Sequence, residues 1–373
     1  MTIASRIPVA RLLVTTSKVA TRWLRLALVA LAAILTVGGC GGSRGAASRS
    51  AAAVRTTGEP GAAAGWTTVD IEKALGATGD ATAREITAIS CTQGPFCMVI
   101  AGHRSATFDG RQFATAGLLG APQAEVDSYE LSCSSARFCM AMTRAETYFT
   151  WNGAGWSREQ RLPMPTGISS GPDYLACPAD GDCLAIGQDG AQGEASVLRY
   201  TAGAWMSTAF ESKGQLLIEV ACASQAYCHI VGNEGEIFTF NGVSWTAPAH
   251  VSVSDYQGSD DTMNSIACAT GPLCIGAGQL AGVVLIDRGS GFARANGVPP
   301  IIDVSPGACG SSTFCTVSTL GPASSFKYFD GVRLQAIAQP PAGVAMNFFS
   351  CTQEAVCLSS VSQSDQALIY RRG

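Results

Sequence analysis

Fourteen of the fifteen cysteines fall into seven pairs, and every pair has five residues between its two members. The pairs are Cys91/Cys97, Cys133/Cys139, Cys177/Cys183, Cys222/Cys228, Cys268/Cys274, Cys309/Cys315 and Cys351/Cys357. The first cysteines of successive pairs are 41 to 46 residues apart. A period of this length predicts a repeat protein, in which each repeat is one supersecondary unit that packs against its neighbours.

The sequence around each cysteine pair repeats as well. An alternating apolar run leads into Ser-Cys or Ala-Cys, and a second apolar run follows the loop, as in ITAISCTQGPFCMVIAG and LIEVACASQAYCHIVG. A glycine-containing turn, an aromatic residue and a closing motif such as FDGRQF, WNGAGW or FNGVSW complete each unit. About four short strands per unit are typical of a propeller blade. We therefore predict an all-β fold, a seven-bladed β-propeller with four-stranded blades over residues 66–373.

The two ends of this region complement each other. The seventh repeat, which starts at Phe348, ends at Gly373 without the strand that carries the Gly-x-x-Trp motif. A matching segment, Gly65-Trp66-Thr67-Thr68-Val69, precedes the first cysteine pair. We expect this N-terminal strand to complete the last blade, because closing the ring removes the open strand edges that would otherwise aggregate.

The five-residue spacing suits a hairpin whose two cysteines face each other across its base and form a disulfide. The alternatives are metal ligation and redox catalysis. Zinc sites favour two to four residues between paired cysteines and need four convergent ligands, whereas redox catalysis needs one activated pair. Export to an oxidising compartment favours seven structural disulfides.

The N-terminal 39 residues have the pattern of an export signal. Five basic residues and no acidic one precede the apolar run 26–37, which is shorter than the roughly 20 residues that a membrane-spanning helix needs. The segment Val37-Gly38-Gly39-Cys40 resembles the bacterial lipobox. The resemblance implies cleavage before Cys40, attachment of diacylglycerol and palmitate-type acyl chains to it, and a lipoprotein held on the outer side of the cell membrane. The alternative is an ordinary signal peptide with Cys40 near the cut.

We accordingly divide the chain into a signal peptide (1–39), a Gly/Ala/Ser-rich linker with the lipidated cysteine (40–65) and the propeller (66–373). Beyond residue 65 the chain has 16 basic and 27 acidic residues. This balance excludes a nucleic-acid-binding role, and it predicts that an anionic membrane surface repels the body of the protein. We expect a monomer.

The sequence contains no evident catalytic constellation. Its three histidines are His103, His229 and His250, and nothing in the sequence places two of them together. The Asn/Asp-Gly-x-x-Trp motif resembles the Asp-box of sialidase-like propellers, and four repeats keep the polar residue before the glycine: Asp109, Asn152, Asn241 and Asp330. The leading Ser-x-Asp of that box is absent. Because the box is structural in that family, the resemblance concerns the fold and carries no glycosidase activity.

The segments that differ most between repeats are the loops between the second and third strands and the connectors between blades. Both are expected at the end of the blades opposite the cysteine loops, where variable loops on a rigid scaffold usually bind ligands. The candidate binding residues are His103, Arg104, Asp127, Tyr129, Arg144, Asp173, Tyr174, Asp189, Glu234, Asp255, Tyr256, Asp260, Asp261 and Asp303. We expect no cofactor and no metal. The alternative is calcium in the acidic connector 255–261, whose spacing differs from an EF-hand loop.

Two functions remain open. The first is a non-catalytic binding or scaffold lipoprotein of the cell envelope, which engages a protein or glycan through the predicted binding rim. The second is a carbohydrate-active enzyme of the sialidase-like glycoside hydrolase type, with its site at the mouth of the central channel. The second would require carboxylates from separate blades, such as Asp127, Asp173, Glu234 and Asp303, to converge.

Overall fold

The computed structural model describes residues 65–76, 85–120, 128–164, 172–189, 194–208, 210–212, 214–250, 263–278, 284–295, 304–319, 326–341, 344, 346–362, 364 and 366–372. The predicted signal peptide, the linker up to residue 64 and Cys40 lie outside this range. Within it, no helix has the length and apolar character that crossing a bilayer requires.

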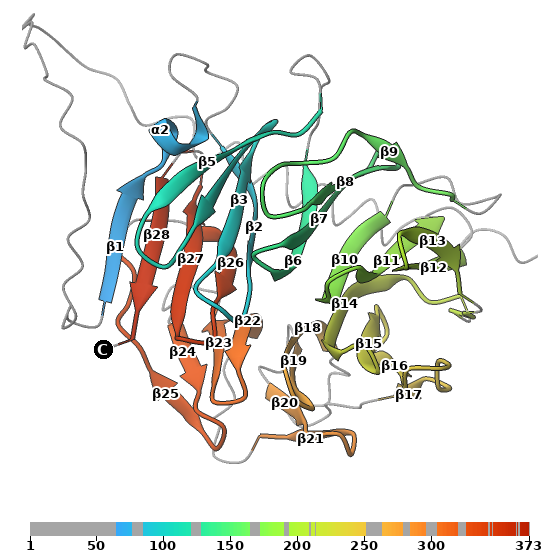
Figure 1. Ribbon diagram of the computed structural model, residues 1–373. Coiled ribbons are helices and arrows are strands. Elements are labelled where there is room, and N and C mark those ends of the chain that lie inside the picture. Colours follow the sequence, from blue (N-terminus) through green and yellow to red (C-terminus); the bar gives the residue numbers. More distant parts are fainter. Residues whose placement is uncertain are drawn as a thin grey trace, which may run out of the picture. The chain divides into compact units, whose positions relative to one another are not determined.

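The described chain forms seven four-stranded antiparallel sheets, the blades (Figure 1). Blades 1 and 2 are β2 (Ile86–Cys91), β3 (Cys97–Ala101), β4 (Arg104–Phe108) and β5 (Phe113–Leu118), then β6 (Tyr129–Ser135), β7 (Phe138–Thr143), β8 (Thr147–Trp151) and β9 (Gln160–Arg161). Blades 3 and 4 are β10 (Pro172–Ala179), β11 (Asp182–Asp189), β12 (Glu194–Thr201) and β13 (Ala204–Ser207), then β14 (Leu217–Ser224), β15 (Tyr227–Gly232), β16 (Glu236–Phe240) and β17 (Ala249–His250).

Blades 5 and 6 are β18 (Met263–Ala269), β19 (Leu273–Gly278), β20 (Val284–Asp287) and β21 (Phe292–Arg294), then β22 (Val304–Ser311), β23 (Phe314–Thr319), β24 (Phe326–Phe329) and β25 (Leu334–Ala336). Blade 7 is β26 (Met346–Cys351), β27 (Val356–Val361), β28 (Gln366–Arg371) and β1 (Gly65–Asp70). The first strand of every blade contacts the first strand of the next, and β26 contacts β2, so the blades close into a ring. The predicted seven-bladed propeller is confirmed.

The N-terminal strand completes blade 7 as predicted. In the antiparallel pair of β1 and β28, Gly65 lies opposite Arg371 and Asp70 lies opposite Gln366. The indole Nε1 of Trp66 donates a 2.6 Å hydrogen bond to the carbonyl of Ala338 in the segment after β25, so β1 also joins blade 7 to blade 6. After β1, the short helix α2 (Glu72–Leu75) buries Ile71 and Leu75 against blades 7 and 1. The ring is therefore sealed by segments from both ends of the described chain.

All seven predicted disulfides are present. Their Cα–Cα distances are 3.9 to 4.1 Å, and in six blades the two cysteines are direct cross-strand partners. In blade 3 the pair Cys177–Cys183 spans a bulge between Ala176 and Ala179. The bridges therefore pin the first two strands of every blade together.

The second cysteine of each pair is the more deeply buried one. These residues are at most 1 % exposed: Cys97, Cys139, Cys183, Cys228, Cys274, Cys315 and Cys357. The sulfurs of Cys228 and Cys315 lie 3.5 and 3.6 Å from the carbonyls of Ser224 and Ser311, and Cys357 packs in an apolar cluster with Tyr370. This burial agrees with the structural role predicted for the disulfides.

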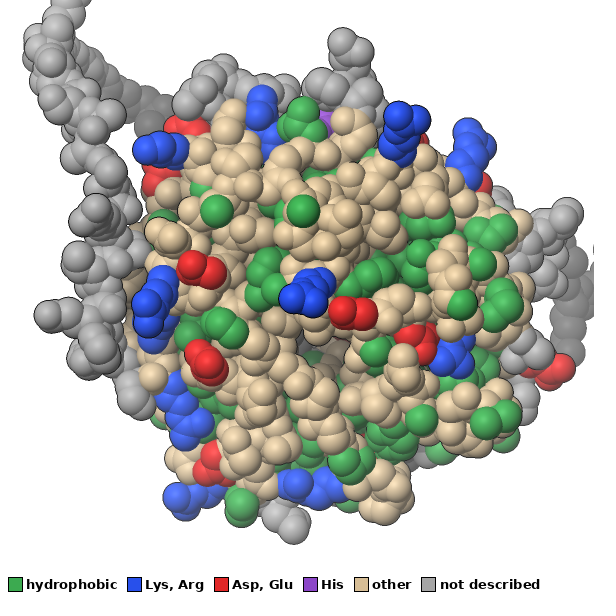
Figure 2. All heavy atoms as spheres, viewed as in Figure 1, with side chains coloured by type: hydrophobic (Ala, Val, Ile, Leu, Met, Phe, Trp, Pro, Cys, Tyr) green, Lys and Arg blue, Asp and Glu red, His purple; other side chains and the backbone are tan. Residues whose placement is uncertain are grey.

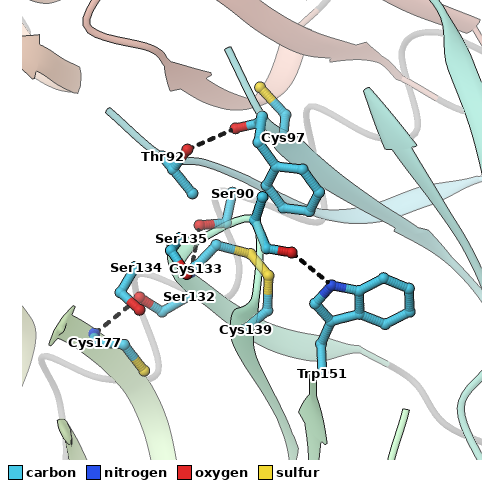
Figure 3. The surroundings of a disulfide bond; sticks show 12 residues. Ser90, Thr92, Cys97, Ser132, Cys133, Ser134, Ser135, Cys139, Trp151 and Cys177 are labelled. Carbon is cyan, nitrogen blue, oxygen red and sulfur yellow. Dashed lines mark hydrogen bonds between the residues drawn. A yellow bond between two sulfur atoms is a disulfide. The ribbon is translucent and has the colours of Figure 1, made fainter. Parts of the chain in front are cut away.

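Hydroxyl groups join some of the inner strands. Ser350, Ser90 and Ser132 each precede the first cysteine of their blade, and each accepts a hydrogen bond from the backbone N–H of the first cysteine in the following blade. Figure 3 shows this arrangement around Cys133–Cys139. The N–O distances are 2.8, 2.9 and 2.9 Å. The other four blades have alanine at this position: Ala176, Ala221, Ala267 and Ala308. The ring thus contains a run of serine-linked interfaces from blade 7 to blade 3.

The turns between third and fourth strands are held by the polar residues that the sequence motif marks. Oδ1 of Asp109 accepts the backbone N–H groups of Arg111 and Gln112, and the equivalent Asn152, Asn241 and Asp330 accept theirs in the same way. The backbone N–H group of Arg333, the Gln335 amide and the backbone N–H group of Val332 lower the pKa of Asp330 to about 2. In blade 5 the residue before the first glycine is Arg288, and Asp287 one position earlier takes over the role by accepting three N–H groups.

Candidate functional site

The strand order gives each blade two chemically different ends. The disulfide hairpins and the turns between third and fourth strands lie at one end, which we call the cystine end. The turns between second and third strands and the connectors between blades lie at the other, the connector end. Figure 2 shows charged side chains of both signs dispersed over the face that it draws, so no broad patch of one sign identifies a ligand surface there.

The structure places the predicted binding residues that it describes at the connector end. His103 and Arg104 belong to the β3–β4 turn, Arg144 follows β7, Asp173 and Tyr174 begin β10, Tyr129 begins β6, Glu234 lies between β15 and β16, and Asp189 ends β11. Asp127, Asp255, Tyr256, Asp260, Asp261 and Asp303 lie outside the described residues, as does the proposed calcium connector. Ligand binding by any of these residues stays a prediction.

Some of these residues have structural contacts. Tyr129 is 3 % exposed, and its hydroxyl lies 3.3 Å from Nδ1 of His103, which contacts the carbonyl of Leu119. The guanidinium of Arg104 donates a 2.7 Å hydrogen bond to the carbonyl of Gly76 after α2. These contacts hold the connector end of blade 1 in place. They leave the residues of blades 2 to 4 as the better candidates for ligand contact.

The residues three positions before the first cysteine form a polar arc on the inner strands of blades 2, 3 and 4. They are Glu130, Tyr174 and Glu219, which pair with Met142, Ile186 and Val231 in equivalent registers. The other blades have Ala88, Ser265, Pro306 and Phe348 at this position. Oε2 of Glu219 accepts a 3.0 Å hydrogen bond from the backbone N–H of Ile266 in blade 5. A side chain at this position therefore points to the following inner strand.

The arc and its neighbours form one electrostatic cluster. Burial raises the pKa of Glu219 to about 8, against the effect of the Ile266 N–H group and with repulsion from Glu130. Burial and the charge of Asp173 raise the pKa of Glu130 to about 7, although Arg144 opposes them. Nε of Arg144 lies 3.2 Å from Oδ1 of Asp173. The pKa of the Tyr174 phenol is raised by burial and then by repulsion from these carboxylates.

This cluster is suited to binding a cation or to donating a hydrogen bond from a protonated carboxyl group. Within the described residues, no group of three or more His, Cys, Asp or Glu side chains has the arrangement that holds a metal ion. Sequence reasoning named Asp173, Tyr174 and Arg144 but missed Glu130 and Glu219. The signal was available, since a glutamate interrupts an apolar inner strand at the same distance from the cysteine in two repeats.

A second polar constellation lies at the interface of blades 4 and 5. Nε2 of His229 lies 3.3 Å from Oδ2 of Asp287, and the Tyr227 hydroxyl donates to the same oxygen at 2.5 Å. Nδ1 of His229 contacts the Thr239 hydroxyl at 3.0 Å. Burial lowers the pKa of His229 to about 4, although the Asp287 carboxylate favours the charged form. The imidazole is therefore neutral at neutral pH.

This constellation replaces an aromatic contact that the other blades share. On the third strand, the partner of the second cysteine is aromatic in six blades: Phe108, Trp151, Tyr200, Phe240, Phe329 and Tyr370. In blade 5 it is Asp287, opposite Cys274. His229 and Asp287 are each 1 % exposed, so a substrate has no access to them. The group is structural, although its residue types resemble a catalytic set.

A scan against models of protein families finds no match, and a search of the curated proteins finds none either. Several solved structures are similar. They include virginiamycin B lyase from Staphylococcus aureus (12 % identity, TM-score 0.56, covering 83 % of this chain and 99 % of the lyase) and YCF48 bound to a D1 peptide (12 %, 0.54, 83 % and 97 %). The WD40 propeller domain of Doa1 is similar as well (10 %, 0.53, 78 % and 94 %). At these identities the likeness shows the propeller fold alone, which hosts enzymes and scaffolds alike.

Proposed function

We propose that this chain is an exported lipoprotein of the cell envelope, attached to the membrane through Cys40, whose propeller binds a protein or glycan partner at the connector end. The observation that carries the proposal is the polar arc of Glu130, Tyr174 and Glu219 with its flanking Arg144–Asp173 pair. Three successive blades contribute to it, at the end where the loops vary most between repeats. Rigid strands position the arc, while the variable connectors surround it.

The chemistry of the arc favours a partner with a cationic group. A buried carboxyl group is driven toward its neutral form, and an ammonium or guanidinium group placed beside it restores the charged form. Binding of such a group would release a proton from Glu130 or Glu219, whose pKa values are about 7 and 8. The affinity should therefore rise between pH 6 and pH 9. A similar solved structure, YCF48, is bound to a peptide, which supports peptide binding as one use of such a ring.

The test is a binding screen of residues 40–373 on arrays of basic peptides and of amine-bearing and neutral glycans at pH 6 and pH 8.5. The double variant Glu130→Gln/Glu219→Gln should bind the ligands found at least about tenfold more weakly, because it removes both charges without changing shape. Glu354→Gln, an exposed carboxylate at the cystine end, is the matched control and should bind normally. Equal binding by the double variant and the wild type would exclude the arc as the binding site.

The pKa of Glu130 also supports a second candidate, a glycoside hydrolase. A carboxyl group with a pKa near 7 is protonated in about half of the molecules at neutral pH, as a general acid requires. Asp173 joins the arc, while Glu234 contacts Gln215 in the loop before β14. Release of reducing sugar by the wild type and loss of at least about a hundredfold in Glu130→Gln would favour the enzyme. A wild type without turnover on the glycans that it binds would favour the binding module.

The membrane attachment is tested separately. Intact mass measurement of the N-terminal peptide from the producing cells should show acylation at Cys40. Cys40→Ala should leave the protein unprocessed or release it from the membrane fraction. An unmodified Cys40 thiol in the mature protein would contradict the lipoprotein proposal and leave the proposal on the polar arc standing.

A further inference from the structure

The topology places the N-terminal attachment of the propeller at its cystine end. β1 pairs antiparallel with β28, and β28 runs toward the cystine end, where its last residue is Arg371. Gly65 lies opposite Arg371, so β1 starts at the same end of blade 7 as the disulfide hairpin. The segment between Cys40 and Gly65 is 24 residues long and spans at most about 90 Å when extended. A chain anchored at Cys40 is thus joined to the ring from its cystine end.

The basic residues at the cystine end extend around most of the ring. They are Arg111, Arg137, Arg288, Arg333, Arg371 and Arg372. Several carboxylates at the same end are engaged by the protein itself. Asp109 and Asp330 accept backbone N–H groups, and Asp180 accepts the hydroxyls of Ser134 and Ser135. Asp287 is buried. Acidic and basic residues are therefore close to balanced there.

The connector end is acidic by comparison. Its described carboxylates are Asp70, Glu72, Glu85, Glu130, Glu146, Glu159, Asp173, Glu211, Glu219, Glu234 and Glu236, and its basic residues are Lys73, Arg104, Arg144, Arg161, Arg294 and Lys327. A strand of six residues separates the two ends by about 20 Å. This exceeds the screening length of about 8–10 Å at physiological salt, so a charged surface beside one end acts on that end almost alone.

We propose that the cystine end is a lipid-facing surface, which rests its arginines on anionic headgroups and turns the connector end away from the membrane. The inference rests on the proposed attachment at Cys40 and assigns an orientation to the proposed binding module. The excess of acidic residues in the whole body predicts repulsion from such a surface. That average hides the difference between the ends. At the cystine end, which is joined to the anchor, arginines and acidic residues are close to balanced, whereas acidic residues predominate at the connector end. The polar arc then faces partners outside.

The test measures which end lies nearer to the lipid. Residues 40–373 are coupled through the Cys40 thiol, the one cysteine outside the seven pairs, to a maleimide lipid in vesicles of phosphatidylglycerol and phosphatidylcholine. A fluorophore is introduced by a bioorthogonal amino acid at Val243, which is 90 % exposed in the blade 4 turn at the cystine end, or at Glu234 in the same blade at the connector end. Energy transfer to a headgroup acceptor should be at least about twofold more efficient from position 243.

Two controls connect the orientation to charge. Arg137→Glu with Arg333→Glu, both exposed at the cystine end, should abolish the difference between the two labels, whereas Arg161→Glu with Arg294→Glu at the connector end should preserve it. Vesicles of phosphatidylcholine alone should also remove it. Equal transfer from both positions, stronger transfer from position 234, or a difference that persists on neutral vesicles would overturn the proposal. Because the lipid is attached chemically, the result is independent of whether cells acylate Cys40.

Discussion

Two neighbouring interfaces of the ring solve the same packing problem with different chemistry. Between blades 3 and 4, Leu184 and Phe240 lie in one apolar cluster. Between blades 4 and 5, the equivalent positions are His229 and Asp287, joined by Tyr227. The apolar interface gains stability from the area that it buries, whereas the polar one depends on every partner being present. The polar interface therefore depends on His229 and Asp287 both being present.

The largest expected effect comes from breaking the polar interface on one side. Asp287→Ala leaves the Tyr227 hydroxyl, the His229 imidazole and three turn N–H groups without their acceptor, and should reduce the free energy of unfolding by about 3–5 kcal/mol. Denaturant titration of the variant and the wild type measures this loss. Asp109→Ala removes the equivalent turn acceptor in blade 1 alone and should cost about 1 kcal/mol. Similar losses for the two variants would mean that the buried partners contribute nothing.

Giving the polar interface the residues of its apolar neighbour should leave the free energy of unfolding unchanged or increase it. The triple variant His229→Leu/Asp287→Phe/Arg288→Asp recreates the Phe-Asp-Gly order of blade 1, with the turn acceptor one residue later. Replacing a buried polar pair by well-packed apolar residues is typically neutral or stabilising by about 1–4 kcal/mol. Thermal and denaturant unfolding of the triple variant beside the wild type provide the measurement. A marked loss of stability would show that the polar group contributes more than packing does.

The two interfaces should also differ in their response to acid. The pKa of His229 is about 4 in the folded protein, below its ordinary value of 6.5, so the unfolded chain binds a proton first. Stability is then fully present above pH 6.5 and falls by roughly 1–3 kcal/mol toward pH 4. The triple variant lacks this group and should show a smaller fall in melting temperature over that range. Other groups titrate in both proteins and affect both alike. An equal fall in the melting temperature of the two proteins would therefore contradict the assignment of this acid response to His229.

The smallest effect concerns the serine-linked interfaces. Ser132→Ala removes the acceptor of the Cys177 N–H group and should cost about 0.5–1.5 kcal/mol. Ala176→Ser supplies the same acceptor where the ring lacks one and should recover up to a similar amount. Denaturant unfolding resolves both changes when they are measured in one background. A destabilising Ala176→Ser would show that the alanine interfaces pack too closely for a hydroxyl.

The fold was predictable because its information is repeated. The cysteine spacing, the alternating inner strands and the missing last strand each point to the same closed ring, and the pairing of β1 with β28 confirms the predicted closure. The polar arc was half predictable, since the loop residues Arg144 and Asp173 stand out while a glutamate inside an apolar strand does not. The role of Asp287 could not be predicted, because this residue lies one position before the place where the turn motif has its polar residue. In the sequence, Arg288 occupies the place before the glycine, and only the strand register shows Asp287 opposite Cys274.

The pairing of β1 with β28 also sets an order of assembly. A chain that crosses a membrane from its N-terminus delivers residues 65–70 first and their partner strand 366–371 last. The cystine hairpins close over short distances and need no other part of the ring, so on the proposed export route most blades can form before the last strand arrives. The seventh blade must wait, and until then β1 is a lone strand with exposed hydrogen-bonding groups. If the proposed export were interrupted, the ring would stay open because the partner strand of β1 would be missing.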